Sequence, residues 1–226
     1  MADASLLARA AACYVRAGVP LDAVRCYRAA GSYRRAADIW ARLGAFPEAA
    51  RDYAAAGAHE EAAWIFADHL GDIPAARAEL AAAADAAAAA APADPGTAQP
   101  AASRAADLRR RLILARCNAA ENVAGAETLA ILTEVMRHLE DEVEPLGRAS
   151  IELRAVVVAE AMNRPDLVAL LFAAAVRGGR PRAAERWNAW SERALGMPLI
   201  LPEPGTDAAV ADDGTVQRAG PRPVRS

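Results

Sequence analysis

The sequence predicts an all-α protein, an α-solenoid of short antiparallel helices, because a repeat of thirteen residues starts near its N-terminus. Glycine keeps the same slot in successive units, at Gly18, Gly31, Gly44 and Gly57, and returns at Gly71 after one additional residue. Alanine follows each glycine by five residues, and a ring or leucine follows it by nine. A fixed period of this length is typical of stacked helices.

Each unit is expected to form one helix. Glycine suits the left-handed backbone position just after a helix end. Pro20, Pro47 and Pro74 stand two or three residues after a glycine, where the next helix begins. Counted from the glycine, positions +2, +5, +9 and +12 are expected to face the core. Helices this short are not stable alone, so neighbouring helices must stabilise them.

The segment from Tyr27 to Ala37, YRAAGSYRRAA, resembles the helical repeats of tetratricopeptide-type and SNAP- or coat-protein-type α-solenoids. The resemblance covers residues 5–80, with a weaker recurrence over 163–196. The period is shorter than the tetratricopeptide unit of about 34 residues, so that family's peptide groove is not carried over. The resemblance implies a protein-binding scaffold and transfers no functional residue.

Four regions are expected along the chain: a repeat array over 1–91, a Pro/Ala linker over 92–101, a second helical region over 102–201 and a disordered tail over 202–226. The second region is either separate from the array or continuous with it. Longer helices are expected at 73–91, 102–121, 126–142, 147–162, 165–177 and 181–195. Asn163 and Gly178 take the glycine slot there, which indicates that the repeat pattern resumes.

Composition restricts the partner and the compartment. All 26 basic residues are arginine, which indicates the codon usage of a GC-rich bacterial genome. A formal net charge of −3 gives no overall attraction to nucleic acid, and no stretch is apolar enough to span a membrane. Cys13, Cys26 and Cys117 form no metal motif, and no export signal is expected, so a cytoplasmic protein is predicted. Cys13 and Cys26 are expected to be buried.

The histidines do not indicate an enzyme. His59 precedes two glutamates, but Ala63 stands where a zinc-binding HExxH helix needs a histidine. His69 lies at the irregular spacing before Gly71, and His138 lies among acidic residues, so both are expected to be structural or solvated. The sequence has no glycine-rich phosphate loop and no nucleophile elbow. No catalytic residue, cofactor or metal is therefore expected.

The most basic cluster lies in the first helix of the second region and consists of Arg104, Arg109, Arg110, Arg111 and Arg116. Nucleic-acid binding would call for a second basic strip or exposed aromatic residues. In a hairpin of helices 102–121 and 126–142, the three consecutive arginines would instead face the acidic residues 140–142. We favour this structural pairing.

The leading hypothesis is a non-catalytic adaptor for protein–protein interaction, a subunit of a bacterial multi-component assembly. The candidate contact residues are Arg28, Arg34, Arg35, Asp38, Arg42, Trp64 and Trp190. Trp64, at position +7, either packs between helices or lies on the surface. Trp190 and the segment 199–201 have two possible roles. They form an exposed docking patch, or the segment folds back over the last helix, which we favour. The alternative function is a regulatory module that binds a small ligand between the two halves.

Overall fold

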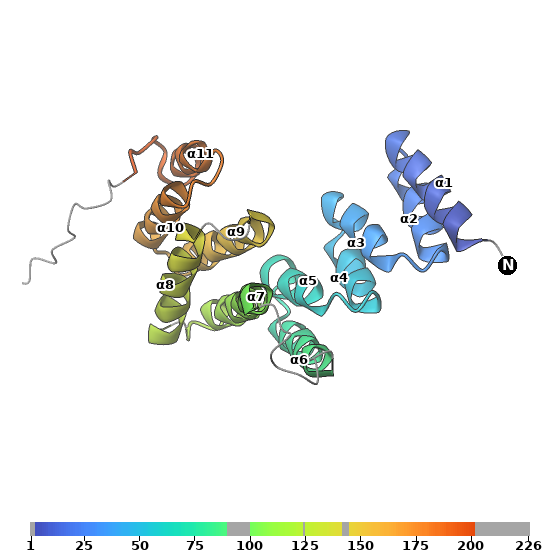
Figure 1. Ribbon diagram of the computed structural model, residues 1–226, viewed down its shortest axis with the longest axis horizontal. Helices are drawn as coiled ribbons and strands as arrows, with labels where there is room; N and C mark the ends of the chain where they lie inside the picture. The colour runs from blue at the N-terminus through green and yellow to red at the C-terminus, as the bar shows by residue number, and fades with distance from the viewer. Residues whose placement is uncertain (1–2, 90–99, 124, 142–144, 202–226) are drawn as a thin grey trace, which may run out of the picture.

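The chain is helical throughout the part that the computed structural model describes, residues 3–89, 100–123, 125–141 and 145–201 (Figure 1). These residues form eleven α-helices and one π-helical turn, and no strand occurs among them. The all-α prediction is therefore confirmed. The predicted tail, 202–226, and residues 92–99 of the predicted linker lie outside the described residues.

The first half is a row of short helices that pack in chain order. Their bounds are α1 Ala4–Arg16, α2 Pro20–Ala29, α3 Tyr33–Arg42, α4 Phe46–Ala55, α5 His59–Ile65 and α6 Ile73–Ala89. Helix α1 packs most closely against α2, α3 against α4 and α5 against α6, and contacts of α2 with α3 and of α4 with α5 join these pairs (Figure 1). This arrangement is compatible with a helical repeat array.

The repeated glycines end the helices as the sequence predicts. All five adopt the left-handed conformation, with φ between +66° and +73°. The N–H after the glycine donates to the carbonyl of the ring position, as from Ser32 to Tyr27 at 2.8 Å, and the other four units repeat this bond. The ring residue therefore accepts the hydrogen bond that closes its own helix.

The alanines at +5 belong to the buried core of the array. Each has no exposed surface: Ala23, Ala36, Ala49, Ala62 and Ala76. Position +12 was predicted to be buried, and this was wrong, because Leu43 is 49% exposed. Positions +6 and +8 are buried instead, as Val24 and Ile39 show. An internal helix has a neighbour on each side, so it needs a wider buried face than one stripe supplies.

The first helix lacks a neighbour on one side. Tyr14, which takes the ring position in α1, is therefore 40% exposed, whereas Tyr27 and Tyr53 are 7% and 8% exposed. Cys13 is exposed as well, so its predicted burial was wrong, and Cys26 is only half-buried. The same repeat position is thus buried or exposed according to the number of helices around it.

A π-helical turn, η1 (Phe66–Leu70), accommodates the one irregular spacing in the repeat. It continues α5 directly, and a π-helical turn holds an extra residue compared with an α-helical one. Gly71 therefore still reaches its left-handed position although the spacing is one residue longer. Within this turn the His69 ring stacks on Phe46, with centroids 3.9 Å apart.

The second half consists of longer helices whose predicted bounds are each within two residues of the structure. These are α7 Pro100–Ala120, α8 Ala126–Glu140, α9 Pro145–Ala161, α10 Pro165–Arg177 and α11 Ala183–Leu195. Because α7 starts at Pro100, the last two residues of the predicted linker are helical. Pro165 opens α10 at its first turn, as its missing N–H permits.

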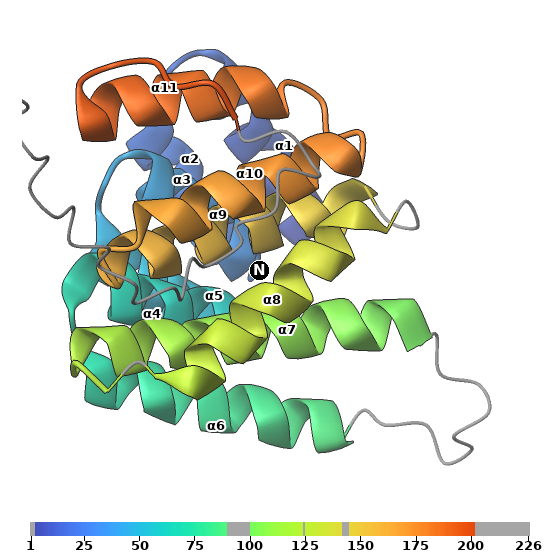
Figure 2. The same ribbon diagram turned by 90° about the vertical axis from the view of Figure 1, so that its left-hand side faces the viewer.

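Packing in the second half follows chain order only from α9 to α11. Helix α7 packs chiefly against α9, and α8 chiefly against α10, while α8 crosses α7 obliquely (Figure 2). The core between them is built from larger side chains, all with no exposed surface: Leu108, Leu112, Leu132, Leu139, Ile151 and Leu171. The predicted α7–α8 hairpin is therefore a minor contact in this half.

The predicted glycine slots in this half are partly correct. Asn163 is left-handed at φ +55°, as expected. The left-handed residue after α10 is Gly179, at φ +66°, rather than the predicted Gly178. Gly178 serves a different purpose, because a Cβ there would lie 1.8 Å from the backbone oxygen of Leu139. Its missing side chain allows the end of α10 to approach the end of α8.

The two halves meet where α7 packs against α5, η1 and α6. Ile113 and Cys117 of α7 are fully buried in one apolar cluster with Ala63 and Ala67. Two ion pairs flank this cluster, Arg116 with Asp68 at 3.0 Å and Arg77 with Glu121 at 2.7 Å. We call this contact the junction.

Candidate functional site

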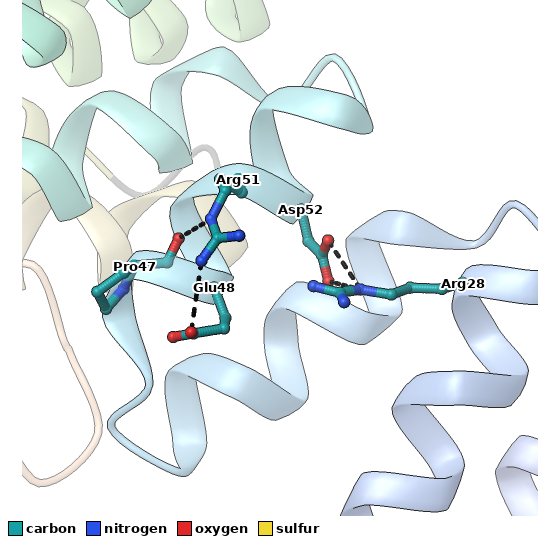
Figure 3. Close-up of polar contacts among 5 residues, drawn as sticks. All are labelled: Arg28, Pro47, Glu48, Arg51 and Asp52. Atoms are coloured by element: carbon teal, nitrogen blue, oxygen red, sulfur yellow. Dashed lines mark hydrogen bonds and ion pairs between the residues drawn. The ribbon is translucent and has the colours of Figure 1, made fainter.

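Arg28, the first candidate contact residue, joins two helices of the array. Its Nε donates to both carboxylate oxygens of Asp52, at 2.8 and 3.0 Å, across from α2 to α4 (Figure 3). Asp52 is 4% exposed, and the Arg28 guanidinium also lies over the Trp40 ring, 5.7 Å from its centroid. Arg28 therefore mainly stabilises contacts between helices of the array.

Sequence reasoning missed Asp52. It occupies position +8, where Ile39 and Ile65 stand buried in other units. The sequence did contain a signal for Asp52: a carboxylate stands at a repeat position that is apolar in other units. A buried carboxylate needs a charged or hydrogen-bonding partner, so the sequence pattern could have pointed to one.

Arg34 and Asp38 also contact neighbouring helices. Arg34 of α3 pairs with Glu61 of α5. The Tyr53 hydroxyl in α4 donates to Asp38 Oδ1 at 2.7 Å. Burial, and next this hydrogen bond to a carboxylate, raise the pKa of Tyr53 well above its usual value. Asp38 therefore supports packing while remaining exposed as a residue.

One side of α3 remains a surface. Arg35, Asp38 and Arg42 are all exposed and follow one another at the i, i+3, i+7 spacing of one helix face. The Arg35 guanidinium lies over the Tyr27 ring at 5.7 Å from its centroid, which holds its position. We call these three residues the α3 strip.

Trp64 belongs to the junction. It is half-buried on α5 and packs against the cluster that contains Ile113 and Cys117. The guanidinium of Arg154 from α9 lies over its ring, 5.1 Å from the centroid. Of the two interpretations of Trp64, the structure therefore shows the packing one.

Trp190 is not part of an exposed patch. It is 6% exposed, stacks on Trp187 with ring centroids 5.3 Å apart, and donates from Nε1 to Glu160. The following segment folds back over α11, since Trp187 Nε1 donates to the Leu199 carbonyl and the Leu199 N–H donates to Ser191. The docking-patch alternative is thus wrong for Trp190, because the rings of this helix fill the core.

The arginine cluster does not pair as predicted. Arg109 donates to Glu60 of α5 at 3.0 Å, and Arg111 donates to Glu134 at 2.6 Å. Glu140, one of the predicted acidic partners, accepts from Arg177 of α10 instead. The predicted partners were wrong because α7 packs chiefly against α9 and crosses α8 obliquely, so Arg111 meets α8 at Glu134 and Arg109 meets α5.

A pocket of about 510 Å³ lies beside the junction. Its walls come from five helices and one loop, so it brings together residues far apart in sequence: Arg34, Gly57, Ala58, His59, Glu60, Glu61, Ala83, Ala86, Arg109, Ser150 and Arg154. Three guanidinium groups and two carboxylates line it. We call it the junction pocket, and its volume is within the usual range for small-molecule sites.

Arg154 is the most unusual residue of the junction pocket. It is 7% exposed, and its buried Nη1 has no hydrogen-bond partner among the described residues. Burial lowers the pKa of Arg154, which nearby Glu61 and Glu60 partly oppose. Sequence reasoning missed Arg154 because α9 shows no repeat pattern that would mark it.

His59 and His69 have structural contacts. His59 Nδ1 lies 2.8 Å from Glu79 Oε2, and His69 stacks on Phe46. Within the described ranges, no group of three or more His, Cys, Asp or Glu residues is placed to hold a metal ion. None of the helices described combines the length and apolar character needed to cross a bilayer.

No family model matches this chain, and neither a curated protein nor a solved structure matches it.

Proposed function

We propose that this chain is a non-catalytic adaptor, an α-solenoid of the tetratricopeptide-like kind, in a cytoplasmic assembly of a bacterium. The observation that carries the proposal is the row of short helices α1 to α6, packed in chain order with the α3 strip left exposed. Helices stacked in this way present extended surfaces to a partner. The sequence resemblance to tetratricopeptide-type and SNAP-type repeats supports the same function.

The α3 strip indicates the chemistry of the partner. Two arginines, Arg35 and Arg42, flank the single carboxylate of Asp38, which is engaged by Tyr53. Arg34 lies on the neighbouring side of the same helix. Complementary charge would therefore favour an acidic segment of a partner protein.

A pull-down with the full chain tests this function. We expect the wild type to recover one protein in stoichiometric amount from a lysate of the source cells. Reversing both strip charges, R35E with R42E, should lower that recovery about tenfold, because like charges would then face the acidic segment. The control is R164E with R182E, since the half-buried Arg164 and the exposed Arg182 lie in the second half, away from the strip.

Equal recovery by the strip variant and the control variant would contradict the proposed surface. Recovery of no stoichiometric protein by the wild type would contradict the adaptor function itself. Far-ultraviolet circular dichroism of each bait confirms that the substitutions leave the helices intact.

A second function, a regulatory module that binds a small ligand, is supported by the junction pocket. The pocket lies between the two halves, since α3, α5 and α6 supply one side and α7 and α9 the other. A ligand there would contact both halves at once. Stabilisation of the chain by a small molecule, without any protein partner, is the result that would favour this function over the adaptor.

A further inference from the structure

We propose that the junction pocket binds a small organic anion, through a carboxylate or phosphate group held by Arg154 and Arg109. The inference deepens the second function above and rests on it. Its basis is the excess of cations over carboxylates in the pocket wall, together with Arg154, a buried wall residue for which the described residues show no ion pair.

Most of the charged side chains in the pocket wall form ion pairs with one another. Glu60 accepts from Arg109 Nε at 3.0 Å, and Glu61 pairs with Arg34. Arg154 is thus the one guanidinium in the wall for which the described residues show no ion pair. The uncompensated charge of the pocket is therefore positive.

Arg154 is costly to the folded chain as it stands. A buried arginine remains charged, and a buried charge without a paired carboxylate lowers stability. The Trp64 ring under the guanidinium, 5.1 Å away, offsets only part of this cost. Such an arrangement is expected where a ligand supplies the missing negative charge, because binding energy then offsets the cost of burial.

The shape of the pocket indicates the size of the ligand. A volume of about 510 Å³ exceeds that of a lone ion and suits a small metabolite. The wall also includes Ala83 and Ala86 of α6 and Gly57 and Ala58 before α5, whose small side chains leave room for the body of a ligand. The anionic group is therefore placed against Arg154 and Arg109, and the body of the ligand against α6.

Thermal unfolding of the full chain tests the proposal, with inorganic phosphate and succinate as probes at constant ionic strength. We expect each to raise the Tm saturably, by about 5 °C at a large excess over its dissociation constant. In R154M the anion-dependent shift should disappear, while the Tm without anion should equal or exceed that of the wild type. A purely packing role of Arg154 on Trp64 predicts a lower Tm instead.

Two further variants keep the test decisive if R154M does not fold. R109Q removes a half-buried arginine of the wall and should raise the half-saturating anion concentration about tenfold. R25M removes an exposed arginine of α2 outside the pocket, and should leave the anion response unchanged. A wild-type Tm that neither anion shifts, or equal responses in R109Q and R25M, would overturn the proposal.

Two further probes distinguish failure of the anion proposal from failure of the ligand-binding function. Glucose and spermidine serve as neutral and cationic probes in the same assay. If either stabilises the chain saturably while the anions do not, the anionic ligand is wrong and the ligand-binding function stands. If no probe stabilises the chain, both are overturned.

Discussion

At the scale of single residues, the polar groups of the array fall into two sets. One set joins helices, as the buried carboxylate of Asp52 does with Arg28, and as Asp38 does with Tyr53. The other set faces solvent, as Arg51 and Glu48 do within α4 (Figure 3). The charged residues of both sets lie outside the predicted apolar stripe, so position in the repeat did not separate them.

The pair of Arg28 and Asp52 should contribute measurably to stability. We expect D52A to lower the free energy of unfolding by about 2 kcal/mol, because Arg28 loses its partner at a largely buried site. Urea denaturation followed by circular dichroism measures the change. The control R51A removes an exposed arginine paired within one helix, and should change stability by less than about 0.5 kcal/mol. Equal effects of the two substitutions would contradict this account.

At the scale of elements, helix ends are the best predicted feature of the chain. The glycine positions, the proline positions and the helix bounds follow from local backbone preferences, which the sequence displays directly. The predicted buried face of each array helix was too narrow. A stripe of one residue per turn describes contact with one neighbouring helix, whereas an internal helix has two. The π-helical turn η1 appears in the sequence only as one extra residue before Gly71.

The left-handed glycines allow a matched test. We expect G31A to destabilise the chain by about 1 kcal/mol, since alanine is strained at a φ of +70°. G31N should cost less, because Asn122 and Asn163 adopt this conformation elsewhere in the chain. No side chain or backbone atom lies near a Cβ at Gly31, so steric contact does not contribute. Equal losses in urea denaturation would show that the backbone conformation is not the cause.

At the scale of the whole molecule, the junction decides how the halves are connected. Ile113 and Cys117 of α7 are buried against the array, so the two halves share an apolar cluster. The ion pair of Arg116 with Asp68 lies beside it, and both side chains are less than a fifth exposed, at 18% and 16%. We therefore expect unfolding of the two halves to be coupled.

A double-mutant cycle on Arg116 and Asp68 measures how much this ion pair contributes to the contact between the halves. We expect an interaction free energy of about 1–2 kcal/mol between R116A and D68A, because the pair is largely shielded from solvent. The same cycle on Arg182 and Glu185, an exposed pair at the start of α11, should give about 0.3 kcal/mol. A coupling at Arg116 no larger than this control would indicate that the pair does not connect the halves.

The sequence allowed the all-α class, the helix bounds and the buried alanines of the array to be predicted, because each depends on residues within a turn or two of the chain. Which helices pack together in the second half was decided by the tertiary structure, since the leucines of α7 to α10 could have served several pairings. The junction pocket depends on that choice. Arg34, Arg109 and Arg154 come from three distant segments, and only the packing of α7 and α9 beside the array brings their charges together.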